Sequence, residues 1–170
     1  MADVELRALA ERLQAICLGS GLRVAFAESC TGGRVGDVLT DVAGSSGYVA
    51  GGVVAYEDAA KEALLGVSRA TLASHGAVSA QVALAMAEGA RTRFATDLAV
   101  SVTGIAGPGG ATPGKPVGLA YVGLAEADGA TVRRFTWNGD REGNKAASVR
   151  AALELLVERA TARAVDRERR

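Results

Sequence analysis

The chain has 170 residues, and its 19 lysines and arginines balance its 19 aspartates and glutamates. A net charge of zero argues against binding to nucleic acid or acidic membranes through a broad basic field, so neither partner is expected. Hydrophobic residues make up 49% of the chain and charged residues 22%, which excludes general disorder. This length supports one hydrophobic core, and we expect a single domain over residues 1–165 with a frayed tail over 166–170.

The small numbers of cysteines and histidines limit which cellular compartment and which cofactors are expected. Two cysteines, Cys17 and Cys30, are too few for a disulfide framework, and the acidic start at Asp3 does not resemble a signal peptide. No stretch of about 18 apolar residues is free of charge, so we expect no membrane span and a cytoplasmic protein. One histidine leaves too few ligands for zinc, so no cofactor is expected, although a magnesium ion held by carboxylates stays open.

The first half of the chain alternates helices with strands. Apolar residues at helical spacing predict helices, and short apolar runs predict strands. In chain order the expected elements are a helix over 4–17, a strand over 22–27, a helix over 35–42, a strand over 48–56 and a short helix over 57–65.

The second half adds a hairpin and a closing helix. Ser68 is placed to cap a short turn, and Ser79 to cap a helix over 80–94. A strand over 97–102 follows, then a hairpin with strands over 117–127 and 131–137, and an amphipathic helix that contains Val149 and Ala160. The fold class expected is therefore α/β: a three-layer α/β/α sandwich on a mixed, mainly parallel sheet, with a C-terminal hairpin and helix.

Ser29 lies where the strand over 22–27 meets the next helix. Backbone amides from Cys30 to Gly33 would point from the helix N-terminus toward any group that Ser29 attacks, which is the geometry of an oxyanion site. The flanking residues do not match the Gly-x-Ser-x-Gly elbow of α/β-hydrolases. A serine that merely caps the helix is the alternative.

Lysine usage draws attention to Lys61, because the chain has three lysines among its 19 basic residues. Its segment, residues 59–65, is poor in other charges, and partial burial there would lower its pKa and leave a neutral amine. A serine nucleophile with a lysine base is a known alternative to Ser-His-Asp. A lysine exposed on a surface helix is the alternative interpretation.

Three further features have two interpretations each. The glycine-rich segment 104–110 lacks the spacing of a P-loop or a Rossmann motif, and it is either a mobile loop or a backbone wall close to a ligand. His75 is interpreted as a C-terminal helix cap, with a catalytic role as the alternative. Arg141 follows the last strand and could hold a phosphate or form a surface ion pair.

Seven motifs in unbroken order, from about residue 5 to residue 160, resemble the CinA C-terminal domain family. They are Ala-Glu-Ser-Cys-Thr-Gly-Gly at 27–33, Gly-Ser-Ser at 44–46, the segment 51–56 with Lys61 five residues later, Gly-Ala-Val-Ser at 76–79, Thr-Gly-Ile-Ala-Gly-Pro at 103–108, Lys-Pro-Val-Gly at 115–118 and Gly-Asp-Arg at 139–141. This resemblance implies a three-layer α/β/α fold, self-association as a homodimer or larger homo-oligomer, and hydrolysis of nicotinamide mononucleotide to nicotinate mononucleotide and ammonia. The chain resembles the stand-alone form of the family, without the N-terminal nucleotide-hydrolysing domain of longer members.

The resemblance carries the family's catalytic serine and lysine onto Ser29 and Lys61. In the expected mechanism, Lys61 takes the proton of Ser29 while amides near Cys30 and Thr31 hold the oxyanion. Hydroxyls of Tyr56 and Thr103 orient the amide or relay a proton. The other residues expected to bind substrate are Glu28, Gly32, Gly33, Gly104, Gly107 and Arg141.

Two other functions remain open. One is a non-catalytic nucleotide sensor or partner-binding module linked to competence and DNA damage, and the other is an amidase for a related nucleotide. Leu119, Glu57 and Lys145 depart from residues common in the family. These departures bear on phosphate affinity more than on the chemistry.

Overall fold

The structure, a computed structural model, describes residues 2–170, within which five strands form one mixed sheet. The strands are β1 (Val24–Glu28), β2 (Val49–Val54), β3 (Leu98–Gly104), β4 (Leu119–Glu126) and β5 (Gly129–Thr136), in the order β2-β1-β3-β4-β5. β1 pairs in parallel with β2 and with β3, whereas β4 is antiparallel to both β3 and β5. Because β4 alone of these strands runs the opposite way, the expected mixed and mainly parallel sheet is confirmed.

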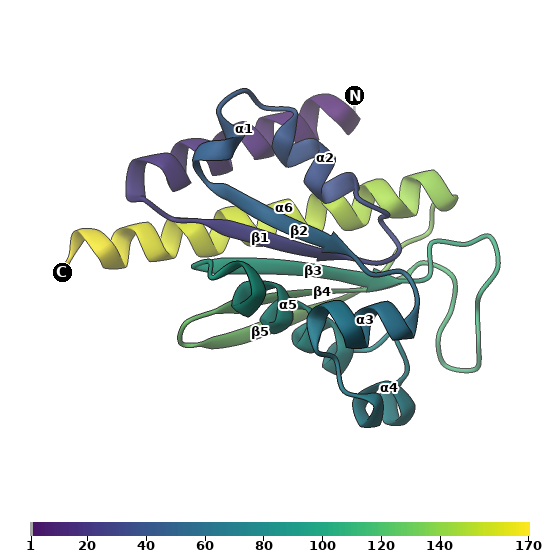
Figure 1. Ribbon diagram of the computed structural model, residues 1–170. Helices are drawn as coiled ribbons and strands as arrows, with labels where there is room; N and C mark the ends of the chain where they lie inside the picture. Colours follow the sequence, from purple (N-terminus) through teal and green to yellow (C-terminus); the bar gives the residue numbers. More distant parts are fainter. Residues whose placement is uncertain (1) are drawn as a thin grey trace.

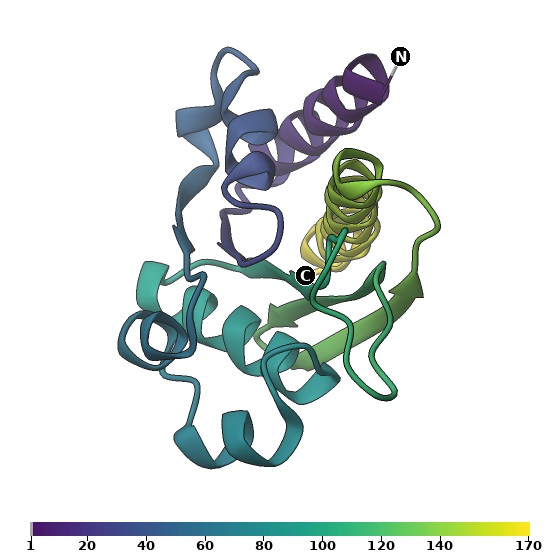
Figure 2. The same ribbon diagram turned by 90° about the vertical axis from the view of Figure 1, so that its right-hand side faces the viewer.

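Helices cover both faces of the sheet (Figure 1). One face carries α1 (Ala2–Ser20), α2 (Arg34–Thr40) and α6 (Arg141–Glu168), and the other carries α3 (Asp58–Leu65), α4 (Arg69–His75) and α5 (Ala80–Phe94). A short 3-10 turn, Ser45–Gly47, precedes β2. Figure 2, turned by a quarter, shows the three layers and the long connection between β3 and β4 that projects beside the start of α6. The three-layer α/β/α sandwich is therefore confirmed.

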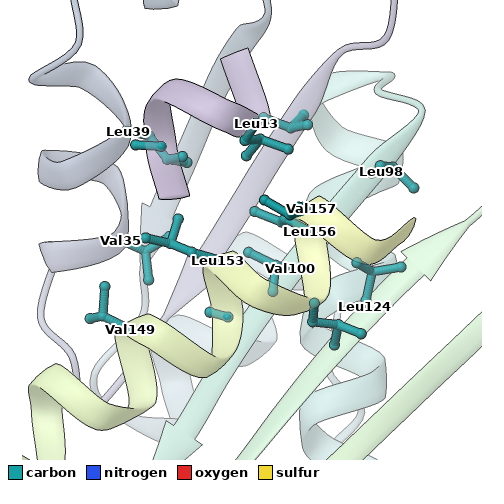
Figure 3. Close-up of a cluster of buried hydrophobic side chains, with 14 of the residues drawn as sticks. Leu13, Val35, Leu39, Leu98, Val100, Leu124, Val149, Leu153, Leu156 and Val157 are labelled. Atoms are coloured by element: carbon teal, nitrogen blue, oxygen red, sulfur yellow. The ribbon is translucent and has the colours of Figure 1, made fainter. Parts of the chain in front are cut away.

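The larger core lies between the sheet and the layer of α1, α2 and α6. Val100 of β3 and Leu124 of β4 meet Leu153 and Leu156 of α6 there, and all four are fully buried (Figure 3). Burying each side chain of this size stabilises a fold by about 1.5–3 kcal/mol. The apolar face of α6 thus holds this helix, and the residues at its N-terminus, against the sheet.

Two glycines make room for Phe26 on β1. A Cβ atom at Gly52 would lie 2.1 Å from the Phe26 ring, and one at Gly36 would lie 2.4 Å from it. Real Cβ atoms do not approach so closely, so the ring requires glycine on both neighbouring elements. This packing explains a glycine in the middle of β2 and sets α2 close to β1, next to Ser29.

The end of the chain differs from the expected frayed tail. α6 continues to Glu168, and Arg167 donates hydrogen bonds to the Ser20 carbonyl at 2.8 Å and the Asp97 carboxylate at 2.6 Å. Residues 166–168 are helical because these contacts hold the last turn against the start of β3. Residues 2–170 contain no helix long and apolar enough to cross a membrane.

Candidate active site

The candidate site lies at the edge of the sheet where β1 and β3 end. Parallel strands bring their carboxyl ends to one edge, and open α/β sheets place ligand crevices there. Ser29 follows β1 directly, Thr103 lies near the end of β3, and Tyr56 and Lys61 follow β2. They share a cavity of about 250 Å³, lined by Ser29, Cys30, Tyr56, Lys61, Ala77, Val78, Thr103–Ala106, Gly107, Gly109, Gly110 and Arg141.

A buried amine faces the Ser29 hydroxyl. Lys61 Nζ lies 3.0 Å from Ser29 Oγ, and the lysine is 1% exposed. The same Nζ also donates to the backbone carbonyls of Ala55 and Tyr56, each at 3.0 Å. Burial lowers the pKa of Lys61 below its ordinary value of 10.5, while the charges of Asp58 and Cys30 oppose that shift.

Three acceptors surround Lys61 Nζ, and they can satisfy either an ammonium or a neutral amine. A neutral amine has two N–H groups and one lone pair, whereas an ammonium has three N–H groups. The carbonyls of Ala55 and Tyr56 accept the two N–H groups. The lone pair is then left to accept the Ser29 hydroxyl proton, which is the first requirement of a Ser-Lys pair.

In the turn around Ser29, several backbone amides donate hydrogen bonds to other groups of the protein. Ser29 N–H donates to Val102 O at 2.9 Å, Gly32 N–H donates to Ser29 O at 3.1 Å, and Gly33 N–H donates to Glu28. The Gly32 and Gly33 amides are therefore already paired within the protein, which does not favour the expectation that they bind substrate. Within residues 2–170, the Cys30 and Thr31 amides donate to no other residue, so they remain for the oxyanion role.

The Glu28 carboxylate is enclosed by the protein. It is 0% exposed and accepts backbone N–H bonds from Gly33, Val35 and Gly36 at 2.9–3.1 Å. These amides and the core enclose the carboxylate, so the expected substrate contact of Glu28 stays a prediction that this geometry does not favour. Glu28 instead ties the first turn of α2 to the end of β1, which fixes the turn that carries Ser29.

Thr103 and Arg141 both line this cavity. Thr103 Oγ1 donates to Ala77 O at 2.8 Å, so its lone pairs are left to accept from a ligand. Arg141 Nη1 donates to Gly107 O at 2.8 Å, and Nη2 lies 3.4 Å from the Tyr56 hydroxyl, which belongs to a residue 63% exposed. The Arg141 guanidinium thus joins the segment 104–110 to the cavity mouth.

Comparison with known proteins matches residues 6–160 to the CinA C-terminal domain. The chain belongs to this family. CinA-like proteins of Mycolicibacterium vanbaalenii and Geobacter sulfurreducens are 54% and 50% identical over 81% and 82% of the chain. The match covers 33% and 34% of those relatives, so the chain spans about a third of their length.

Solved structures of CinA relatives share the fold. The competence/damage inducible protein CihA of Agrobacterium tumefaciens superposes with a TM-score of 0.88 at 43% identity, covering 91% of this chain and 94% of that one. A CinA superfamily protein of Escherichia coli gives 0.88 at 32% identity, covering 93% and 92%. The names of these CinA relatives give no activity or substrate.

The structure adds residues of this CinA domain that sequence reasoning missed. Ala77 and Val78 line the cavity just before α5, and the Ala77 carbonyl accepts the Thr103 hydroxyl. Asn144 on α6 is buried, donates to Ala106 O at 3.0 Å and accepts from Gly139 N at 2.9 Å. A polar residue at a core-facing helix position was the available signal for Asn144. Within residues 2–170, no three His, Cys, Asp or Glu side chains gather to hold a metal ion.

Proposed function

We propose that this domain hydrolyses the carboxamide of nicotinamide mononucleotide to nicotinate mononucleotide and ammonia through an acyl-enzyme. The observation that carries the proposal is the 3.0 Å approach of buried Lys61 Nζ to Ser29 Oγ inside a cavity. The resemblance to CinA-type amidohydrolases supplies the substrate.

In the first half-reaction, Lys61 accepts the Ser29 proton while Oγ bonds to the carboxamide carbon. The Cys30 and Thr31 amides donate to the oxygen that becomes negative, and this stabilises the tetrahedral state. Thr103 Oγ1 accepts from the carboxamide N–H₂ and orients it. The C–N bond then breaks, the protonated Lys61 returns its proton to the leaving nitrogen, and ammonia departs.

In the second half-reaction, a water molecule attacks the ester on Ser29. Lys61, neutral again, takes one proton from this water as the new C–O bond forms. The bond between the acyl carbon and Ser29 Oγ then breaks, and the serine regains its proton from Lys61. The product acid loses its remaining proton to solvent, and nicotinate mononucleotide leaves as the carboxylate. Arg141 and the segment 104–110 hold the ribose and phosphate, and this remote binding orients the reacting end.

The test is the release of ammonia from a panel of amides. Nicotinamide mononucleotide, its riboside, free nicotinamide and another ring-carboxamide nucleotide are incubated with the pure chain, and ammonia and carboxylate are measured together. We expect equal amounts of both products, fastest from nicotinamide mononucleotide. Preference for the other nucleotide would indicate a different amidase. Binding without any ammonia would favour a non-catalytic nucleotide sensor.

A further inference from the structure

Two motifs that have no role in the proposed reaction meet in the structure. They are residues 76–79, which join α4 to α5, and residues 115–118, at the end of the long β3–β4 connection. Lys115 Nζ donates a hydrogen bond to the backbone carbonyl of His75 at 2.6 Å. This contact ties together two connections that lie far apart in the sequence.

The connection between α4 and α5 is held by three side chains. The consecutive carbonyls of residues 75, 76 and 77 each accept one hydrogen bond, from Lys115 Nζ at 2.6 Å, Ser79 Oγ at 2.8 Å and Thr103 Oγ1 at 2.8 Å. These donors come from the β3–β4 connection, from the cap of α5 and from β3. Residues 76–79 lie outside any helix or strand, so their position depends on these side chains.

Lys115 suits this contact through its charge and through the space beside Gly76. His75 is the last residue of α4, and a cation is favourable at the C-terminal end of a helix, where backbone carbonyls lack partners. Gly76 has a φ of +74°, and a Cβ atom built on it would lie 2.8 Å from Lys115 Nζ. A larger residue at position 76 would therefore push the amine away from the His75 carbonyl.

The held segment orients the Thr103 hydroxyl. Thr103 Oγ1 donates its proton to Ala77 O, which leaves its lone pairs to accept from the carboxamide N–H₂ of the proposed substrate. Without Ala77 O at this place, the hydroxyl would be free to rotate and point its proton at the N–H₂ group. Ala77 lines the cavity and Lys115 does not, so Lys115 can influence a bound amide only through this segment.

We propose that Lys115 is a positioning residue, which fixes Ala77 and thereby orients the Thr103 hydroxyl for an amide substrate. The proposal rests on the proposed function for the reaction, whereas the tie between Lys115 and His75 is a separate claim about the fold. An ester has no N–H group to donate to Thr103, so its hydrolysis does not depend on this hydroxyl. Lys115 thus contributes to a preference for amides over esters.

Two measurements on the full chain test this role in Lys115→Met. Nicotinamide mononucleotide and the methyl ester of nicotinate mononucleotide give the same product, so one assay yields kcat and KM for the amide and for the ester. Hydrogen exchange of the backbone amides over residues 72–79 reports on the tie without any reaction. The matched control is Arg167→Met, which removes a cation that donates to the Ser20 carbonyl at 2.8 Å, before β1 begins and thus at the opposite edge of the sheet.

We expect Lys115→Met to lower kcat for the amide about tenfold with little change in KM, and to lower kcat for the ester less than about twofold. Exchange over residues 72–79 should become about threefold faster or more. Arg167→Met should change none of these values by more than about twofold. Thr103→Val already loses the oriented hydroxyl, so adding Lys115→Met to it should lower the amide rate no further.

Equal losses of kcat for the amide and the ester, or losses that multiply in the double variant, would contradict the positioning role of Lys115. Unchanged hydrogen exchange in Lys115→Met would exclude the tie itself, whatever the rates. Faster exchange in this variant, together with a wild type that hydrolyses neither substrate, would support the tie and refute the proposed function.

Discussion

At the scale of single residues, the buried surroundings of Lys61 favour its neutral amine over its charged ammonium form. The side chain is almost completely buried, and burial is the largest influence on its pKa. The Asp58 carboxylate acts in the other direction and raises that pKa. The fraction of neutral Lys61 amine is therefore set by a balance that single substitutions can shift.

Replacing Lys61 with arginine should abolish catalysis while keeping the charge. A guanidinium stays protonated at any working pH and cannot accept the Ser29 proton. General-base catalysis contributes about a hundredfold to ten-thousandfold, so we expect kcat/KM for nicotinamide mononucleotide to fall by at least a hundredfold. Lys61→Met should fail equally, and activity retained by either variant would exclude Lys61 as the base.

The pH dependence of the rate tests the same residue without removing it. The base form of Lys61 exists above its pKa, so kcat/KM should rise with pH through a value below 10.5. Asp58→Asn removes a charge that raises this pKa, so the rising limb should move to lower pH. Glu57→Gln, one residue earlier and also exposed, is the matched control and should leave the limb in place. If the rising part of the pH profile of kcat/KM is the same in Asp58→Asn as in the wild type, the assignment of that rise to Lys61 is contradicted.

Which residues meet in the cavity was predictable, but the role of each was not. Ser29 and Lys61 stood out through their local context and the motif resemblance, and the structure places their reactive atoms 3.0 Å apart. Glu28 belongs to the same motif, yet its carboxylate turns into the protein. Sequence spacing places residues on elements but does not give the direction of a side chain at a strand end. That direction depends on the backbone amides of α2.

At the scale of elements, the connection between β1 and α2 depends on the buried charge of Glu28. Three backbone N–H groups converge on its two oxygens. A glutamine has one acceptor oxygen, and its amide N–H₂ would face backbone donors. The connection would lose at least one charge-assisted bond, and the turn with the Cys30 and Thr31 amides would no longer be fixed.

Glu28→Gln should therefore lower both stability and kcat. Hydrogen bonds to a charged group contribute about 1.5–3 kcal/mol, so urea unfolding should show a loss in that range. We also expect kcat, measured well below the unfolding temperature, to fall at least tenfold with little change in KM. A destabilised variant with full kcat would mean that Glu28 supports the fold alone.

The spacing of apolar residues predicts most of the helices and strands, whereas polar contacts determine where they begin and end. The helix after Ser79 was predicted with its observed bounds, because Ser79 accepts the Val82 amide as a cap. The last helix begins much earlier than its apolar residues indicate, since Asp140 caps it before the core-facing stretch. The path of the β3–β4 connection depends on distant partners such as Lys115 Nζ and His75 O, 2.6 Å apart. No local pattern gives such a contact.

At the scale of the whole molecule, the surface left open by the fold indicates where the expected self-association would take place. The small residues of α5, Ala83, Ala87 and Ala90, are fully buried against the sheet and cannot form a partner surface. β2 is an edge strand, and Val54, Tyr56 and Leu64 at and beyond its end are exposed. A second copy could cover this region, which adjoins the cavity mouth.

We expect a homodimer, the commonest assembly of a soluble chain. Light scattering at micromolar concentration should give about twice the chain mass of 17.2 kDa. Val54→Glu, at the exposed edge, should shift the mass toward one chain, whereas Val4→Glu, at an exposed apolar residue on α1, should not. A single-chain mass that persists on tenfold concentration, with full activity, would exclude a role for a second copy.

The central claim is that Ser29 performs the reaction, and Ser29→Ala tests it most directly. The substitution removes one oxygen beside a well-packed core, so the circular dichroism spectrum and the unfolding temperature should stay near those of the wild type. Without a nucleophile, the rate of nicotinate mononucleotide formation from nicotinamide mononucleotide should fall by about a thousandfold or more. A folded Ser29→Ala protein that retains more than about a tenth of the wild-type rate would contradict the Ser29–Lys61 mechanism.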